Sequence, residues 1–163
     1  MGDQKSAING RNDFYSYLYT TLSPRVTING VTGKMIADKS SIDSEHPHLP
    51  AYANTCDIYF YPDKDKVAVQ AKLYGSDKKM LQDFDWNHTH KNKDKYGNIT
   101  EIFPKGIVHV QEYSVTKRKD NKTGKWKDHF KRKSNKARLM TSEEIKKCGP
   151  ILLKFNPTLK FRP

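Results

Sequence analysis

Apolar and polar side chains alternate with a period of two through the middle of the chain. The alternation predicts strands at Asp57–Tyr61, Lys66–Tyr74, Met80–Trp86 and Ile107–Thr116, with a possible further strand at Trp126–Lys131. Strands that follow one another with short turns between them pair with their sequence neighbours. We therefore expect a meander of four or five antiparallel strands.

The segments between these strands are rich in turn-forming residues. Turns are predicted at Pro62–Asp65, at Gly75–Asp77 and at Asp120–Gly124, the last of which closes a hairpin. The longer stretch from Asn87 to Lys105 is polar and is interpreted as a loop. Residues 29–55 are interpreted as irregular, with a turn at Asn29 and Gly30.

Helical periodicity occurs near both ends. Asp13–Leu22 has apolar residues at helical spacing, a plausible cap at Asn12 or Asp13, and Pro24 just beyond its end. Thr141 to Glu144 fits a capping box, in which each of these two side chains bonds the backbone of the other residue. The second helix is expected to end at Gly149 and Pro150.

These elements predict an α+β fold: an N-terminal helix packed on a four- to five-stranded antiparallel meander, with a short C-terminal helix. A length of 163 residues suits a single domain. Within it, 1–56 is expected to hold the first helix and the irregular segment, 57–131 the sheet, and 132–163 the short helix and an extended tail.

Composition narrows the class of protein. No window approaches the ~20 apolar residues of a membrane span, and residues 1–10 lack the apolar run of a signal peptide. Aromatic residues make up 11% of the chain, which favours a folded domain despite a mean hydropathy of −0.88. Cys56 and Cys148 belong to no CxxC pair, and we expect reduced thiols.

Positive charge is concentrated in the second part of the chain. Residues 64–163 hold 25 Lys and Arg against 11 Asp and Glu, whereas residues 1–63 hold 5 against 7. A dense basic stripe suits a polyanion, because each neutralised phosphate releases counterions. We expect nucleic acid, RNA in preference to DNA, as the partner. The candidate nucleic-acid-binding residues are Lys117, Arg118, Lys131, Arg132, Lys133 and Arg138.

Polar side chains recur on one face of the predicted sheet. Gln70 and Lys72 share a face of their strand, as do Asp83 and Asp85 of theirs, and the loop after Trp86 adds two histidines. Acid, base and cation together suit general acid–base cleavage of a phosphodiester. His88 or His109 would act as base and acid, and Lys72 would stabilise the phosphate. The candidate catalytic residues are Lys72, Asp85, His88, His90, His109, Gln111 and Tyr113.

A metal site is the alternative use of the same residues. Asp85, His88 and His90 lie within six residues, and His109 would supply a fourth ligand. No HExxH motif, phosphate-binding glycine loop or zinc-deaminase signature accompanies them. No cofactor is favoured from the sequence, and a divalent metal remains the open alternative.

The stretch containing these residues resembles a known class of protein. The run DFDWNHTH followed by GIVHVQEY is similar to C-terminal toxin modules of bacterial polymorphic toxins, including the Rhs and contact-dependent types. The matching residues are Asp83, Asp85, Trp86, His88, His90 and His109. The resemblance extends to modules of the barnase/EndoU/colicin/RelE superfamily. It implies metal-independent RNase activity, an acidic immunity protein as partner, and delivery into a target cell as part of a larger secreted effector.

The sequence is therefore compatible with three functions. The first is a toxin-type endoribonuclease. The second is a non-enzymatic nucleic-acid-binding module with Tyr59, Tyr61, Tyr74 or Trp126 as stacking platforms. The third is a metal-dependent DNase, whose activity a chelator would abolish.

Overall fold

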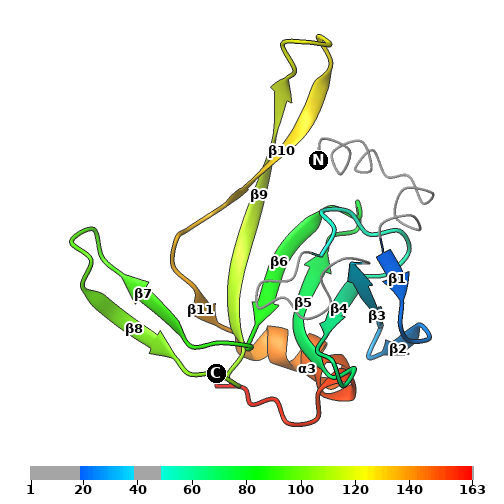
Figure 1. The fold of residues 1–163 in the computed structure, drawn as a ribbon, viewed down its shortest axis with the longest axis vertical. Coiled ribbons are helices and arrows are strands. Elements are labelled where there is room, and N and C mark those ends of the chain that lie inside the picture. Colours follow the sequence, from blue (N-terminus) through cyan, green and yellow to red (C-terminus); the bar gives the residue numbers. More distant parts are fainter. Residues whose placement is uncertain (1–18, 39–48, 163) are drawn as a thin grey trace.

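The computed structural model describes residues 19–38 and 49–162 (Figure 1). Its described part is mostly β structure with one helix at the C-terminal end. The elements are β1 (Tyr19–Thr21), β2 (Val26–Ile28), β3 (Val31–Asp38), β4 (Ile58–Pro62), β5 (Ala68–Tyr74), β6 (Met80–Asp85), β7 (His90–Lys93), β8 (Ile99–Phe103), β9 (His109–Lys119), β10 (Trp126–Arg132), β11 (Arg138–Leu139) and α3 (Ser142–Phe155).

Nine strands form one mixed sheet, in the order β1-β3-β4-β5-β6-β9-β10, with β2 also paired to β3 and β11 to β9. The strands from β4 to β10 in this path pair antiparallel with their neighbours, as the turns between them predict. β3 and β4 pair in parallel. β7 and β8 form a separate two-stranded hairpin, inserted between β6 and β9.

The predicted α+β class is wrong. The sheet is larger and mixed, and within the described residues no helix precedes it. Tyr19–Thr21, the end of the predicted first helix, is strand β1, and residues 13–18 lie outside the described part. Aromatic and β-branched side chains favour a strand, and β1 gains pairing with β3, so tertiary pairing overrides the helical spacing.

The interpretation of residues 29–55 as irregular is also wrong for its first part, where β3 lies. The predicted turn at Asn29 and Gly30 is confirmed. Both residues have positive φ, 55° and 78°, and they join β2 to β3 as a two-residue hairpin turn. Gly33 follows in β3, where an added Cβ would lie 2.6 Å from Cγ2 of Ile58, so glycine permits the close β3–β4 pairing.

Helix α3 covers one face of the sheet and closes the main core. The face is apolar because alternate residues of the central strands point to it, among them Phe60 and Phe84, both fully buried. Ile151 and Leu152 pack into the same cluster from the helix. Phe155 stacks on Phe60 with ring centroids 4.2 Å apart.

The predicted capping box of this helix is confirmed. Thr141 accepts a hydrogen bond from the Glu144 backbone, and the Glu144 side chain accepts one from the Thr141 backbone. The predicted end at Gly149 and Pro150 is wrong. Pro150 cannot donate to the Lys146 carbonyl four residues earlier, but that oxygen accepts a 3.0 Å bond from Asn29 Nδ2. The β2–β3 turn thereby supports the helix at its proline.

Two hairpins extend from the body of the molecule (Figure 1). The longer is formed by β9 and β10 and is here called the arm; the shorter is the β7–β8 hairpin, which falls where a polar loop was predicted. β9 belongs to both the sheet and the arm, because its first residues pair with β6 and its later ones with β10. No helix among the described residues is long and apolar enough to cross a membrane.

Candidate active site

The sheet face opposite α3 carries a row of polar side chains. Register places Gln70 opposite Asp85, and Asp85 in turn opposite His109. One step along, Lys72 faces Asp83 and Asp83 faces Gln111. The shared face predicted from the alternation is thus confirmed for the strand residues of the candidate site. Of the remaining two histidines, His88 lies between β6 and β7, and His90 is the first residue of β7.

Lys72 is bound within this face. It is only 8% exposed, its Nζ lies 3.5 Å from Asp83 Oδ1, and it lies 5.2 Å from the ring centroid of Tyr113. The Tyr113 hydroxyl donates to the second Asp83 oxygen. Burial and the charge and hydrogen bond of Asp83 together raise the pKa of Tyr113. Lys72, Asp83 and Tyr113 therefore form a partly buried ion-pair network, which Arg132 joins through a hydrogen bond with Tyr113.

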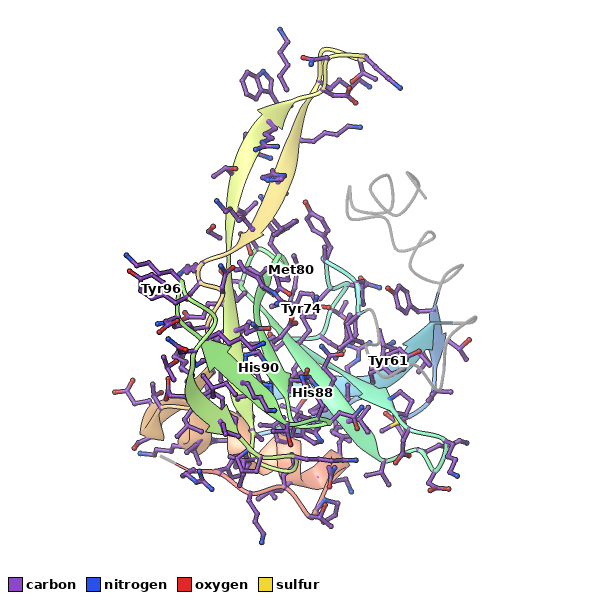
Figure 2. The ribbon with its side chains drawn as sticks, turned by 60° about the vertical axis from the view of Figure 1, so that its left-hand side comes forward. Tyr61, Tyr74, Met80, His88, His90 and Tyr96 are labelled. Atoms are coloured by element: carbon purple, nitrogen blue, oxygen red, sulfur yellow. The ribbon has the colours of Figure 1, made fainter. Side chains whose placement is uncertain are left out.

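The three histidines of the candidate site come together at one end of the polar face. The ring of His109 lies 5.6 Å from that of His88 and 5.1 Å from that of His90, measured between centroids. One nitrogen from each ring lies within 4.8 Å of the other two. Figure 2 shows His88 and His90 close together where the β7–β8 hairpin meets the sheet. We call these residues the histidine cluster.

His109 is the buried member of the histidine cluster. It is 2% exposed, and its Nδ1 atom is buried without a hydrogen bond of normal geometry among the described residues, although the Ile107 backbone lies close to the ring. Burial, together with the neighbouring His90 and His88, lowers the pKa of His109 to about 4, against the opposing charge of Asp85. His109 is consequently neutral at physiological pH and keeps a nitrogen lone pair.

His90 is oriented by a buried asparagine. Asn92 is 1% exposed, and its Oδ1 accepts a bond from the Ala137 backbone while its Nδ2 donates to the Ala137 carbonyl. These two bonds fix which end of the amide is oxygen. The same Oδ1 lies 3.1 Å from Nε2 of His90, which must therefore be the donor. In neutral His90 the lone pair is then on Nδ1.

His88 lies beside a carboxylate. Its Nδ1 lies 3.7 Å from Asp85 Oδ2, and the side chains of His88 and Asp85 are 25% and 23% exposed. The other Asp85 oxygen accepts a bond from the Asn87 backbone. Asp85 thus faces both His88 and, across the strand pair, His109. The cluster has one carboxylate at its edge and stays partly open to solvent.

Two glutamines on the polar face retain unused hydrogen-bonding atoms. Gln70 Oε1 and Gln111 Nε2 are buried, and neither has a partner within the described part of the chain. Buried polar atoms are nearly always paired, with protein or with a bound molecule. One acceptor and one donor beside the histidine cluster are suited to orient water or a substrate.

The arm continues the same face toward its tip. Residues of β9 alternate, so Lys117 and Lys119 share the face of His109, and Arg132 joins it because it pairs with Tyr113. Arg118 and Lys131 lie on the opposite face of the arm. His109 and Lys117 are separated by eight residues, or roughly 27 Å at the rise of a strand. Trp126, 65% exposed, pairs with Lys119 near the end of the arm.

Three of the candidate basic residues contact carboxylates: Arg138, Lys133 and Lys117, of which Lys117 meets Asp128 but is 60% exposed. Arg138 is bound by Glu112 and by both oxygens of Glu144, and these contacts raise its pKa. We therefore leave Arg138 out of the proposed binding surface. Lys133 lies 4.0 Å from Glu112 but remains more than half exposed. The candidate residues that remain for the binding surface are Lys117, Arg118, Lys131, Arg132 and Lys133, and the exposed Lys119 joins them.

The base of the arm is fixed to the body by one aspartate. The side chain of Asp128 is 6% exposed and contacts Lys117 at 2.5 Å, Lys79 at 3.1 Å and the Tyr52 hydroxyl. The ring of Tyr52 also packs edge-on against Phe130 at 5.5 Å. Burial alone would raise the pKa of Asp128, but the bonds from Lys117, Tyr52 and Lys79 outweigh it and lower the pKa to about 2.

We predict that Asp128→Asn destabilises the protein in a pH-dependent way. The pKa of Asp128 is about 2 in the folded state against 3.8 for the ordinary group, so its ionised form favours folding above pH 3.8 by on the order of 2 kcal/mol. That contribution falls away as the pH drops through 2. Urea unfolding should show the full difference between variant and wild type at pH 6. A difference that stays constant from pH 6 to pH 2 would contradict the assignment.

Sequence reasoning found the histidines and Asp85 but neither Asn92, which orients His90, nor the structural role of Asp128. Asn92 lies in a segment that was predicted to be a polar loop. Its buried side chain is hydrogen-bonded to the backbone of Ala137, which is far away in the sequence. Asp128 appears in sequence as a lone acid within a basic run. An acid isolated among lysines is a usable signal of an ion-pair hub, whereas no local pattern identifies Asn92.

Comparison of the chain with protein-family models, with curated proteins and with solved structures finds no match. The resemblance to bacterial toxin modules therefore remains a prediction from the sequence. The functional argument rests on the geometry of the histidine cluster and the arm.

Proposed function

We propose that this protein is a nuclease that binds RNA along the arm and cleaves its phosphodiester backbone at the histidine cluster. One observation carries the proposal: β9 holds both the buried His109 and the basic residues of the arm on one continuous face. A polyanion held by Lys119 and Arg132 is thereby led toward the cluster, and Lys117 lies on the same face, although it is paired with Asp128.

The charges support binding of a phosphate backbone in particular. Lys119, Lys131 and Arg132 are exposed. Between residues 113 and 132 the arm carries two carboxylates, Asp120 and Asp128, so positive charge is in clear excess there. Phosphate contacts of this kind fix position without reading sequence. Trp126 offers a flat ring beside Lys119 on which a base can stack.

The cluster supports a reaction at the phosphate. Phosphodiester cleavage needs an activated nucleophile, stabilisation of the charge on phosphorus and a proton for the departing oxygen. His88, His90 and His109 present imidazole nitrogens close together, with Asp85 beside them. Lys72 is committed to Asp83 and contributes positive charge to the face from a distance, without a free ammonium group for the substrate.

A toxin role accounts for the same features. The resemblance of the DFDWNHTH segment to toxin modules supports it, and such a protein requires an acidic immunity partner. The exposed lysines and arginines of the arm are where an acidic surface would bind. Co-expression with such a partner would then be needed to produce the active protein in bacteria.

Incubation of the purified chain with total RNA tests the proposal. We expect cleavage of RNA at catalytic enzyme concentrations in at least one of two conditions, with EDTA or with added Zn²⁺ or Mn²⁺. A duplex DNA of equal charge serves as the competing substrate. Intact RNA in both conditions at equimolar protein would overturn the proposal and favour a binding module instead.

We predict that the two faces of the arm differ in their contribution to RNA binding. Lys119→Ala with Arg132→Ala removes two charges from the face shared with His109, and Arg118→Ala with Lys131→Ala removes two from the other. Each phosphate contact contributes about 0.7 to the salt slope for a single strand. The first pair should weaken binding more and lower the slope by about 1.4. Fluorescence anisotropy over a salt series measures both quantities, and equal effects of the two pairs would contradict the assigned face.

A further inference from the structure

The histidine cluster has the composition and the spacing of a metal site. Imidazole is the preferred ligand of several divalent transition metals, and three histidines with one open position form a common catalytic zinc site. One nitrogen of each of His88, His90 and His109 lies within 4.8 Å of the others. Neighbouring ligands of tetrahedral Zn²⁺ lie roughly 3.3 Å apart, so each nitrogen needs to move inward by less than about 1 Å.

We infer that His88, His90 and His109 bind one divalent transition metal ion, for which Zn²⁺ is the best match. The partners of these histidines support the assignment. Asn92 accepts the Nε2 proton of His90, which leaves the lone pair of neutral His90 on Nδ1, and Nδ1 of His109 is buried without a hydrogen bond of normal geometry among the described residues. Outer-shell acceptors that fix the tautomer are a regular feature of histidine metal ligands.

Asp85 is better suited to hydrogen-bond a metal ligand than to bind the metal ion itself. Its Oδ2 lies 3.7 Å from Nδ1 of His88, longer than a hydrogen bond, so a small shift of the side chains would complete a carboxylate–histidine–metal triad. With three protein ligands, the fourth position of a tetrahedral ion is open to water. The half-buried His88 and His90 leave that position accessible from solvent, whereas the buried His109 anchors the site in the sheet.

General acid–base catalysis by the three histidines alone fits this geometry less well than a metal-assisted reaction does. In an in-line displacement the base and the acid act on opposite sides of the phosphorus. Three rings packed at centroid distances of 5.1 to 6.2 Å leave no room for a phosphate between them. A single metal ion fits that space, and the phosphate would then approach from the open side.

The hydrolytic role of the metal rests on the proposed function, but metal binding does not. Metal-bound water loses a proton to solvent, and its oxygen forms a bond to phosphorus. The ester P–O bond breaks, and the departing oxygen takes up a proton. The net reaction adds one water across the phosphodiester and requires no other reactant.

Metal binding is measured on the full chain, stripped with a chelator and titrated with Zn²⁺ by calorimetry. We expect one ion per chain. His88→Ala and His90→Ala should each weaken binding at least about 100-fold, since even loss of an outer-shell partner costs about 10- to 100-fold. Both histidines are half-buried, so these variants avoid the folding risk of His109→Ala. The control is His129→Ala, which removes an imidazole from the arm.

Titration with Co²⁺ gives a second readout, because the visible absorption of tetrahedral cobalt reports the ligand set. No binding by the wild type, or equal binding by the wild type and both cluster variants, overturns the inference. Metal binding without RNA cleavage supports the metal site and counts against the proposed nuclease. RNA cleavage by stripped protein that binds no metal supports the nuclease and overturns the metal site.

Discussion

Replacing His90 by alanine should lower the rate of RNA cleavage at saturating substrate by about 100-fold or more, with little change in RNA affinity. Proton transfer by a positioned side chain contributes about 10²- to 10⁴-fold, and loss of a metal ligand removes the nucleophile altogether. His90 is half-buried and lies in the hairpin at the edge of the fold, so its removal leaves the core intact. Single-turnover cleavage of a labelled RNA measures the effect.

His129→Ala is the matched control for His90→Ala. It removes a half-buried imidazole from β10, remote from the cluster, and should leave the cleavage rate at saturation unchanged. Thermal unfolding of both variants checks that each remains folded. Equal cleavage by His90→Ala and wild-type protein would exclude the cluster as the site of reaction.

Replacing Phe60 by alanine should lower the free energy of unfolding by about 3–5 kcal/mol, the largest stability effect we expect from a single change. Phe60 is fully buried in the sheet and stacks on Phe155 of α3. Truncation leaves a cavity and removes the aromatic contact between the sheet and the helix. Urea unfolding monitored by circular dichroism gives the difference.

Tyr96→Ala provides the comparison for Phe60→Ala, because Tyr96 is 77% exposed on the β7–β8 hairpin and should change stability by less than about 0.5 kcal/mol. A double-mutant cycle of Phe60 with Phe155 isolates the stacking contact, for which a coupling of about 0.5–1.5 kcal/mol is typical. A loss in Phe60→Ala no larger than that in Tyr96→Ala would contradict the assigned packing of α3.

Much of the central sheet could be predicted from the sequence, because each of its strands is both alternating and bounded by turn residues. Lys66–Tyr74 and Met80–Trp86 fall close to β5 and β6, and the capping box at Thr141 marks the start of α3. Local signals suffice where a strand pairs with its neighbour in the chain. The same alternation placed Asp85 and His109 on one face.

The rest of the fold depends on contacts between distant segments. β3 pairs in parallel with β4, a pairing that neither segment encodes locally, and α3 continues through Pro150 because Asn29 supplies the missing hydrogen bond. Tyr19 and its neighbours carry helical spacing but pair with β3 as a strand. In each case a long-range partner decided the structure against the local pattern.

The candidate site, like the fold, could be predicted from the sequence only in part. The types and spacing of His88, His90 and Asp85 identify them in sequence, and the register of β6 with β9 then adds His109. The preference for a metal-independent reaction came from the resemblance to toxin modules, and the packing of the three imidazoles favours the metal alternative. The choice between these two alternatives depends on the distances between the side chains. The spacing of the residues along the sequence does not give these distances.

The central claim is that one RNA molecule is bound by the arm and cleaved at the histidine cluster. Single-turnover cleavage of a labelled RNA over a range of protein concentrations tests it most directly, with the wild type, the Lys119→Ala and Arg132→Ala pair, and His88→Ala. We predict that the arm variant raises the half-saturating concentration and leaves the maximal rate unchanged. His88→Ala should do the reverse. Loss of the maximal rate in the arm variant, or an unchanged maximal rate in His88→Ala, would contradict the account.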